Sequence, residues 1–476
     1  MALRRCYMFR VAAIAEILTC TLVLWLTWAD CIRLEKNKNK DYPMLSLLGL
    51  LLGLGLLIVL TMRGFNLFIT APLCALLVAL TNGIPFWQVA DKIDFVHGYM
   101  NGFSGFVANW FLMFLLGSLF GKLMEHTGAA DAVALAIVKR LGHKRAVLAI
   151  VLACAVLTYG GVSLFVVAFS AYPMAVSLFK GANLPRRFIP ATLALGSVTF
   201  TMTSAGSPEI QNWIPIPYLG TTPYAGWEVS LVVAAFMAIG GYAALMWMIK
   251  GAQARGEHFI ARATDPELSD KALPHWLTGL IPLLVVLVTS FLLHDSLQQA
   301  ALIIALAGGV VSLYLLNFRF LHNPAAATNE GVLGALLAIG NTAAVVGFGG
   351  VARLTPAFGE VVHFMTHLPG PELIGAAVAV SAIAGLTGSA SGGQAIALPE
   401  IAPTYLERGV DAEQLHRVVA ISSGALDSLP HNGYVVTTIR AICGETHQNA
   451  YWPVAVVSVL MPLLGVVLAI LLFQWF

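Results

Sequence analysis

The sequence predicts an all-α integral membrane protein, and three observations lead to that fold class. Hydrophobic residues make up 58% of the 476 positions and charged residues only 11%, with a mean hydropathy of +0.82. Soluble globular chains carry about 25% charged residues. Apolar runs of about 20 residues recur along the chain, and their glycine- and proline-containing interruptions fall at matching places in the two halves. This composition excludes a nucleic-acid-binding protein, a disordered scaffold and a disulfide-stapled secreted domain.

Eight apolar segments have about the length of a membrane-spanning helix. Lysine and arginine collect on the cytoplasmic side of such helices, so the charged loops indicate the orientation. With the loop 125–145 placed inside, 15 basic residues after position 43 fall inside, and the four that fall outside are Lys92, Arg353, Arg408 and Arg417. An amphipathic helix at the membrane interface is expected over 129–141. The predicted spans are residues 44–62, 65–81, 102–124, 226–249, 275–294, 297–316, 328–350 and 453–475.

Two further segments predict re-entrant hairpins. Residues 145–187 are basic at both ends, which places both ends on the cytoplasmic side. The two apolar arms are short for a span, and Gly160-Gly161 between them lets the chain reverse in a confined space. The second half contains a matching tip over 387–393, Thr-Gly-Ser-Ala-Ser-Gly-Gly. Irregular backbone at this depth is tolerated only inside protein or beside a water-filled cavity.

Each hairpin is followed by a helix that the sequence interrupts. A helix over 186–203 runs into Thr-Ser-Ala-Gly-Ser-Pro-Glu at 203–209. A helix that begins near residue 412 runs into Asp-Ser-Leu-Pro-His-Asn-Gly at 427–433. The order of helix, hairpin, interrupted helix and helix thus occurs twice, with opposite orientations in the membrane. The sequence therefore predicts two inverted repeats, each with a re-entrant hairpin and a discontinuous helix.

The repeats divide the chain into four parts. Residues 44–250 form the first repeat, 251–274 a cytoplasmic linker and 275–476 the second repeat. Residues 1–43 differ from the rest, since they hold 7 of the 26 lysines and arginines. Two interpretations of this atypical N-terminal extension stay open: an additional helix, or a mis-assigned start with translation beginning at Met44.

Interrupted helices at membrane depth predict a binding site for a small anion. An interruption exposes unpaired N–H groups whose dipoles attract a carboxylate. Hydroxyl and amide side chains beside it add donors, although a single Ser or Thr also bonds its own helix backbone. No Lys or Arg lies in these interruptions, so we expect dipoles and hydroxyls to hold the anion weakly enough for release. The predicted substrate-binding residues are Gly160, Gly161, Ser163, Thr203, Ser204, Ser207, Asn212, Ser389, Ser391, Gly392, Gly393, Ser423 and Asn432.

Charged residues at membrane depth are functional candidates. Asp427 and Glu209 each stand beside an interruption, and His431 follows Asp427 by four residues. An imidazole near a carboxylate exchanges a proton in the physiological pH range. We therefore expect Asp427, His431 and Glu209 to couple proton movement to transport. Two alternatives stay open: Asp427 as a simple cap of the interruption, and Na⁺ in place of the proton.

An enzyme and a channel are the other function classes to weigh. An intramembrane hydrolase would use Ser389 or Ser391 with His431 as base, but residues 388–392 lack the Gly-x-Ser-x-Gly arrangement. No His-Glu-x-x-His motif occurs, and neither a metal site nor a cofactor is expected. A channel needs a continuous pore, whereas paired hairpins favour alternating access. The sequence thus predicts a carrier.

Four motifs stand at the two hairpins and the two interruptions: Thr-Tyr-Gly-Gly-Val-Ser at 158–163, Thr-Met-Thr-Ser-Ala-Gly-Ser-Pro-Glu-Ile-Gln-Asn at 201–212, Thr-Gly-Ser-Ala-Ser-Gly-Gly at 387–393 and Ser-Gly-Ala-Leu-Asp-Ser-Leu-Pro-His-Asn-Gly at 423–433. Together they resemble the gluconate permease (GntP) family of carboxylate:proton symporters, within the ion transporter superfamily with inverted repeats. The resemblance covers residues 44–476. It implies symport of gluconate, 3-hydroxybutyrate or a related acid, a homodimer, and a place in the bacterial cytoplasmic (inner) membrane. A Na⁺-coupled carboxylate carrier is the alternative.

Overall fold

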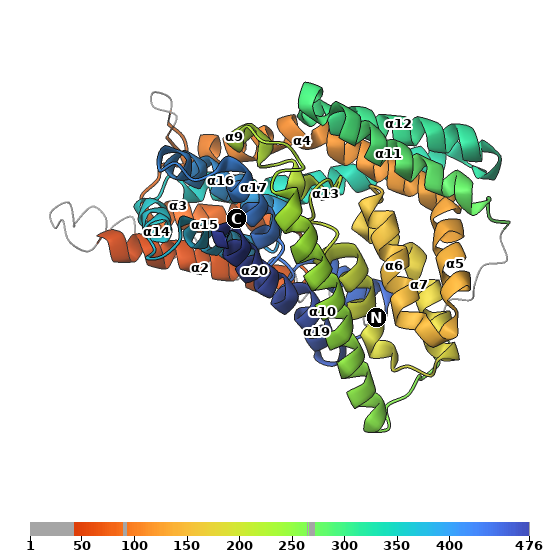
Figure 1. Ribbon diagram of the computed structural model, residues 1–476. Helices are drawn as coiled ribbons and strands as arrows, with labels where there is room; N and C mark the ends of the chain where they lie inside the picture. Colours follow the sequence, from red (N-terminus) through yellow and green to blue (C-terminus); the bar gives the residue numbers. More distant parts are fainter. Residues whose placement is uncertain (1–41, 89–92, 264, 266–271, 476) are drawn as a thin grey trace, which may run out of the picture.

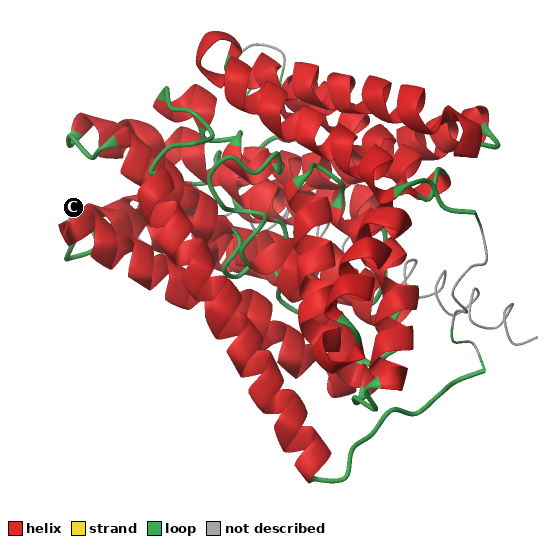
Figure 2. Cartoon of the chain, turned by 45° about the vertical axis from the view of Figure 1, so that its right-hand side comes forward, coloured by secondary structure: helices red, strands yellow, loops and turns green. Residues whose placement is uncertain are grey.

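The computed structural model describes residues 42–88, 93–263, 265 and 272–475. All regular elements in these residues are helices (Figure 1; Figure 2), which confirms the all-α fold class. The predicted N-terminal extension lies outside the described residues, apart from its last two. Eight described segments are long and apolar enough to cross a membrane. They are α2 (Tyr42–Met62), α4 (Phe95–His126), α7 (Leu164–Gly181), α10 (Trp227–Ala254), α11 (Trp276–Leu297), α12 (Gln299–Asn317), α13 (Pro324–Ala352) and the run from α19 (His447–Ala455) to α20 (Met461–Trp475).

Two helices differ from the prediction, the short helix α3 and the longer helix α7, and further short helices complete the architecture. The predicted span 65–81 is α3, which has 15 residues because the Asn66 side chain caps its start by accepting a hydrogen bond from the Phe68 N–H. Conversely, α7 reaches 18 residues because it continues through Pro173. The shorter helices that shape the hairpins and their surroundings are α3 (Leu67–Thr81), α5 (Ala129–Leu141), α6 (Ala146–Tyr159), α14 (Pro356–Thr366), α15 (Glu372–Thr387), α16 (Ala390–Glu407) and α17 (Ala412–Ser423).

Helices α4 and α13 pack along each other and, with α11 and α12, form the layer across the top of Figure 1. Glycines bring the α4 and α13 backbones into contact. A β-carbon at Gly102 would lie 2.6 Å from the Val346 carbonyl oxygen, and one at Gly350 would overlap the Gly98 carbonyl oxygen. Small residues at such crossings let helices approach closely in a membrane, where lipid supplies no hydrophobic drive for association. This layer is therefore a closely packed support for the rest of the chain.

Two helical hairpins lie on opposite sides of α10 and α17 in Figure 1. Helices α6 and α7 form the first, and its tip reverses at Gly161, which has a φ of +92°. Helices α15 and α16 form the second, whose tip reverses at Gly388 with a φ of +62°. Side chains other than hydrogen are strained at such angles, so both tips favour glycine. Both predicted hairpins are present as helical hairpins, and their re-entry from one side of a membrane stays a prediction.

The linker between α10 and α11 forms ion pairs with residues of both halves of the chain. The buried Glu445 carboxylate, in the turn after the second interruption, contacts two guanidinium groups. One of these groups belongs to the linker and the other to the corner after α7. A network of this kind is stronger evidence for stability than separate exposed pairs. The pairs are Arg187–Glu257 (2.6 Å), Arg255–Glu257 (3.3 Å), Arg186–Asp265 (2.7 Å), Arg186–Glu445 (3.3 Å) and Arg262–Glu445 (2.6 Å).

We expect the Glu257→Gln variant to lose less stability on acidification than the native protein does. A side-chain hydrogen bond from Arg187 holds the pKa of Glu257 below its ordinary value. Such a carboxylate contributes its full stabilisation above its ordinary pKa, and this contribution disappears as the pH falls through the lowered value. The fall in melting temperature between about pH 6 and about pH 3 should therefore be smaller in the variant. An equal change in Glu360→Gln, which alters an exposed carboxylate without an ion pair in the described structure, would contradict this assignment.

Candidate functional site

The first interrupted helix starts as α8 (Ile189–Ala194), widens into a π-helical turn over Leu195–Thr199 and then stops. Residues 200–209 continue as turns that are mostly buried. Two short helices follow, η4 (Ile210–Asn212) and α9 (Ile216–Leu219). π-Helical turns are frequent at functional sites. The predicted interruption is present and starts three residues earlier than expected.

The second interrupted helix is α17, which begins after the Asp411 cap and ends at Ser423. Residues 424–432 form turns, and the path continues through α18 (Gly433–Val436) into a π-helical turn over Thr437–Ile442. Both predicted interruptions are therefore present, and each has a π-helical turn on one side. Because this irregular backbone is mostly buried, its polar groups must be satisfied by neighbouring protein or by a water-filled cavity.

Each hairpin tip contacts the interruption of its own half. In the first half, the Tyr159 hydroxyl donates a hydrogen bond to the Ala205 carbonyl oxygen. In the second half, the Asn432 side-chain amide donates to the Gly388 carbonyl oxygen at 3.0 Å. A β-carbon at Gly388 would also lie 2.8 Å from the His431 ring, so this tip has no room for a side chain. The hairpins are thus joined to the interruptions by direct contacts.

Arg417 of α17 reaches the first interruption from the other half of the chain and is 0% exposed. Its guanidinium donates hydrogen bonds to the Thr203 carbonyl oxygen and to Asn212 Oδ1, both at 2.7 Å. It also donates to the carbonyl oxygens of Ala225 (2.9 Å) and Pro223 (3.1 Å). All four acceptors are neutral, and no described carboxylate lies within ion-pair distance. Since arginine has five N–H donors, one remains uncommitted.

We did not expect a basic side chain at either interruption, and the structure places Arg417 at the first one. We had counted this residue only among the four basic residues that fall outside. The structure buries Arg417 because α17 is surrounded by protein on all its faces from Leu415 to Ser423. An anion at this site would therefore face a full positive charge in addition to helix dipoles.

Gln394 of α16 joins the second hairpin to both interruptions. Its Nε2 donates hydrogen bonds to the Gln211 carbonyl oxygen (3.0 Å) and to Ser423 Oγ (3.1 Å). The Ser423 hydroxyl donates to the Ala420 carbonyl oxygen, so it accepts from Gln394, and this fixes the orientation of the amide. Gln394 Oε1 and Gln211 Oε1 are buried without a hydrogen-bond partner. We call the following residues the central cluster: Thr203, Gln211, Asn212, Gln394, Arg417 and Ser423.

Three predicted substrate-binding residues, Thr203, Asn212 and Ser423, belong to the central cluster. The other predicted residues of the first half mainly support backbone or packing. The Ser204 hydroxyl donates to a carbonyl oxygen one turn back, and the Ser207 hydroxyl accepts a hydrogen bond from the backbone two residues on. Gly160 rests on α11, as does Gly161. Ser163 precedes α7 and forms no capping hydrogen bond.

The predicted residues of the second hairpin shape its tip. The Ser389 hydroxyl caps α16 by accepting a hydrogen bond from the Gly392 N–H at 3.1 Å. Ser391 Oγ lies 3.4 Å from Ser389 Oγ. A β-carbon at Gly393 would lie 2.6 Å from the Ala384 α-carbon, so the two arms cross in close contact there. These residues hold Gln394, the next residue in the chain, beside the interruptions.

The three predicted proton-coupling residues are not joined to one another. Asp427 is buried and accepts a hydrogen bond from the Ser428 hydroxyl at 2.9 Å. His431 is also buried, and its Nε2 has no hydrogen-bond partner. Within the described residues, no hydrogen bond or ion pair links Asp427 to His431. Glu209 is half-buried and forms no ion pair in this part of the chain.

Comparison with known proteins identifies the family of this chain. The family model for GntP family permeases matches residues 45–368. YxjC, an uncharacterised transporter of Bacillus subtilis, is 37% identical in an alignment of 454 positions that covers 86% of this chain and 94% of YxjC. This chain belongs to the GntP permease family. A low-affinity gluconate transporter of Escherichia coli is 28% identical over 159 residues, which are 33% of this chain and 34% of that transporter.

A solved structure supports the fold of this GntP-family permease. The Alcanivorax borkumensis transporter YdaH superimposes with a TM-score of 0.56 at 15% identity, covering 86% of this chain and 98% of YdaH. Family membership and the eight apolar helices make the protein a multi-pass membrane transporter, which in bacteria lies in the inner membrane. Its relatives are permeases and not enzymes, so the hydrolase alternative is rejected.

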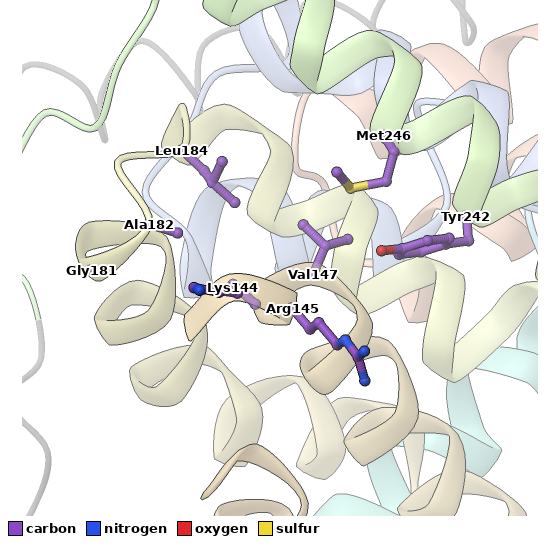
Figure 3. Close-up of a pocket in the computed structure, with 9 residues that line it drawn as sticks. Lys144, Arg145, Val147, Gly181, Ala182, Leu184, Tyr242 and Met246 are labelled. Carbon is purple, nitrogen blue, oxygen red and sulfur yellow. The ribbon is translucent and has the colours of Figure 1, made fainter. Parts of the chain in front are cut away.

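A surface pocket of about 360 Å³ (Figure 3) is lined by no residue of the permease's central cluster. Lys144 and Arg145, directly before α6, line it together with Tyr242 and Met246 of α10. None of the predicted site residues contributes to its lining. The central cluster is instead enclosed by protein, since the side chains of Asn212, Gln394 and Arg417 are all fully buried.

The predicted site omitted three residues of the permease's central cluster: Arg417, Gln394 and Gln211. A usable signal existed for each of them. Gln211 stands in the motif at 201–212, next to the predicted Asn212. The helix predicted from residue 412 already contains position 417, next to apolar Val418 and Val419. Gln394 directly follows the glycine pair of the hairpin motif, where small residues indicate close packing.

Proposed function

We propose that this permease is a secondary carrier that moves a small hydroxy acid or sugar acid, such as gluconate, by proton symport with alternating access. One observation carries the proposal: the buried guanidinium of Arg417 has neutral partners only, within the described residues. A buried charge is costly unless an opposite charge balances it. A substrate carboxylate beside the first interruption would supply that balance and use the uncommitted N–H group.

The arrangement of elements supports a moving carrier. We propose that the two halves act as inverted repeats and that the hairpins move against the layer of α4, α11, α12 and α13. The central cluster contains residues of both interruptions and of the second hairpin, so a shift of these elements would change the site directly. The family resemblance also implies a homodimer, which belongs to the same proposal.

Proton coupling completes the proposal. We propose Asp427 as the residue that takes up the proton, with His431 and Glu209 as further candidates. Asp427 is buried beside the second interruption, and its carboxylate accepts a hydrogen bond from a neutral hydroxyl, that of Ser428. Protonation would remove the charge that the carboxylate carries into the protein interior, where charges are expensive. The alternative coupling ion is Na⁺.

Uptake into proteoliposomes tests the proposed function. We expect saturable uptake of gluconate, 3-hydroxybutyrate or lactate, with stimulation by an inwardly directed proton gradient and no response to a Na⁺ gradient. Citrate and D-serine complete the panel as a tricarboxylate and a zwitterion. Stimulation of uptake by a Na⁺ gradient alone would identify Na⁺, and not the proton, as the coupling ion. Uptake of none of the hydroxy acids, or conductance at channel rates, would contradict the proposed carrier.

A further inference from the structure

We infer that Gln394 binds a hydroxyl group of the substrate, so that the central cluster selects hydroxylated acids over plain carboxylates. This inference rests on the proposed function and deepens it by naming the residue that would read the hydroxyl. Its evidence is a fully buried amide whose donors are occupied and whose acceptor is free.

The hydrogen bonds of Gln394 can be accounted for completely. Both hydrogens of Nε2 are used, by the Gln211 carbonyl oxygen and by Ser423 Oγ. The side chain is 0% exposed, yet Oε1 has no donor. Gln211 Oε1 is a second buried acceptor without a partner. Buried polar groups are paired in the great majority of cases, so the free Oε1 of Gln394 calls for an arriving donor.

The missing donor must come from a group other than the carboxylate. An ionised carboxylate only accepts hydrogen bonds, whereas a hydroxyl donates one. One of the four acceptors of Arg417 is Asn212 Oδ1, and one of the two acceptors of Gln394 is the Gln211 carbonyl oxygen. The cation and the side chain with the free acceptor thus contact neighbouring residues of one interruption. A molecule that carries both a carboxylate and a hydroxyl complements this pair.

A bound Na⁺ is the competing explanation for the free oxygens, and the charge of Arg417 argues against it. The guanidinium and a cation at Gln394 would repel each other strongly in the low dielectric of the protein interior. A plain carboxylic acid would neutralise Arg417 but leave Gln394 Oε1 unpaired. Sites built to bind a substrate hydroxyl discriminate against analogues that lack it for this reason.

Calorimetric binding of 3-hydroxybutyrate and butyrate to the purified full-length chain in detergent tests the inference. Binding is preferable to uptake here, because butyric acid crosses bilayers unaided. We expect the native protein to prefer 3-hydroxybutyrate by roughly 10- to 100-fold, the effect of leaving one buried acceptor unpaired. Gln394→Met, which keeps the length of the side chain and removes the acceptor, should reduce the preference to about threefold or less.

Asn317→Leu is the matched control. Asn317 of α12 is also a fully buried amide, but its Oδ1 accepts a hydrogen bond from the Thr278 hydroxyl at 2.7 Å. This variant loses a buried amide without losing a free acceptor, so its preference for 3-hydroxybutyrate should match that of the native protein. A loss of preference in both variants would assign the effect to general damage and overturn the role of Gln394.

The remaining outcomes separate this inference from the proposed function. Equal affinity of the native protein for both acids would overturn the inference but not the proposed carboxylate carrier. This is also the result expected if a water molecule, and not the substrate, donates to Gln394 Oε1. This native comparison decides the question even if Gln394→Met does not fold. Binding of the acids that requires Na⁺, with this requirement lost in Gln394→Met, would show that Gln394 binds Na⁺ and not a substrate hydroxyl. Binding of neither acid, together with failure of the whole uptake panel, would remove the proposed function and the inference with it.

Discussion

Replacing Arg417 by glutamine should reduce the initial rate of substrate uptake by about 100-fold or more. The substitution removes the positive charge that an anion would meet at the first interruption, while an amide still donates to some of the same acceptors. Loss of one partner of a buried charge pair costs about 2–5 kcal/mol, which corresponds to a factor of about 30 to several thousand. Initial rates in proteoliposomes, normalised to the amount of inserted protein, provide the measurement.

A purely structural role of Arg417 predicts a different pattern, and two further variants separate the roles. Arg417→Lys keeps the charge with fewer donors, so it should retain more uptake than Arg417→Gln at a similar melting temperature. Arg353→Gln is the matched control. The Arg353 guanidinium also binds carbonyl oxygens, those of Ala395 and Ile396, but it has a carboxylate partner, Glu400, at 3.3 Å. Native uptake in Arg417→Gln would contradict the charge-based site.

Asp427→Asn should abolish the response of uptake to a proton gradient. Asparagine has nearly the shape of a protonated aspartic acid but cannot gain or lose a proton. Substrate should still equilibrate across the membrane by exchange, while accumulation above equilibrium under an inwardly directed proton gradient should disappear. The measurement compares counterflow with gradient-driven accumulation in the same vesicles.

Two control variants test whether the effect belongs to the Asp427 carboxylate. Ser428→Ala removes the hydroxyl that donates to Asp427 and leaves the carboxylate in place, so accumulation should persist. Glu209→Gln tests the other acidic candidate, which is half-buried beside the first interruption. Accumulation that is unchanged in Asp427→Asn and lost in Glu209→Gln would transfer the coupling role to Glu209.

Much of the fold was predictable because the strongest signals in a membrane chain are local. Apolar length predicted the long helices, and the glycine pair at 160–161 and the motif at 387–393 predicted the two hairpin tips, where Gly161 and Gly388 have positive φ angles. The interruptions after α8 and α17 followed from proline, glycine and polar residues inside apolar runs. Helix α5 occupies the predicted range, 129–141. Each of these features depends on neighbouring residues in the chain.

The candidate site was predictable only in part. Polar composition selected Thr203 and Asn212, which contact Arg417, and Ser423, which contacts Gln394. It also selected Ser204, which bonds its own helical turn. A hydroxyl at an interruption looks the same in sequence whether it points along its own backbone or toward another element. Hydrogen bonding within a turn and hydrogen bonding across the fold therefore cannot be separated by residue type.

The sequence by itself determined that this protein is an all-helical membrane transporter of one family, with two hairpins and two interrupted helices. Only the tertiary structure decided which charge reaches the site. Arg417 was counted only among the basic residues outside, because lysine and arginine usually mark the aqueous side of a membrane. Packing of α17 between the two interruptions instead gives its guanidinium four backbone and amide acceptors that lie 192 to 214 residues away in sequence. A buried arginine is tolerated only where such distant acceptors converge, and convergence is a property of the folded chain.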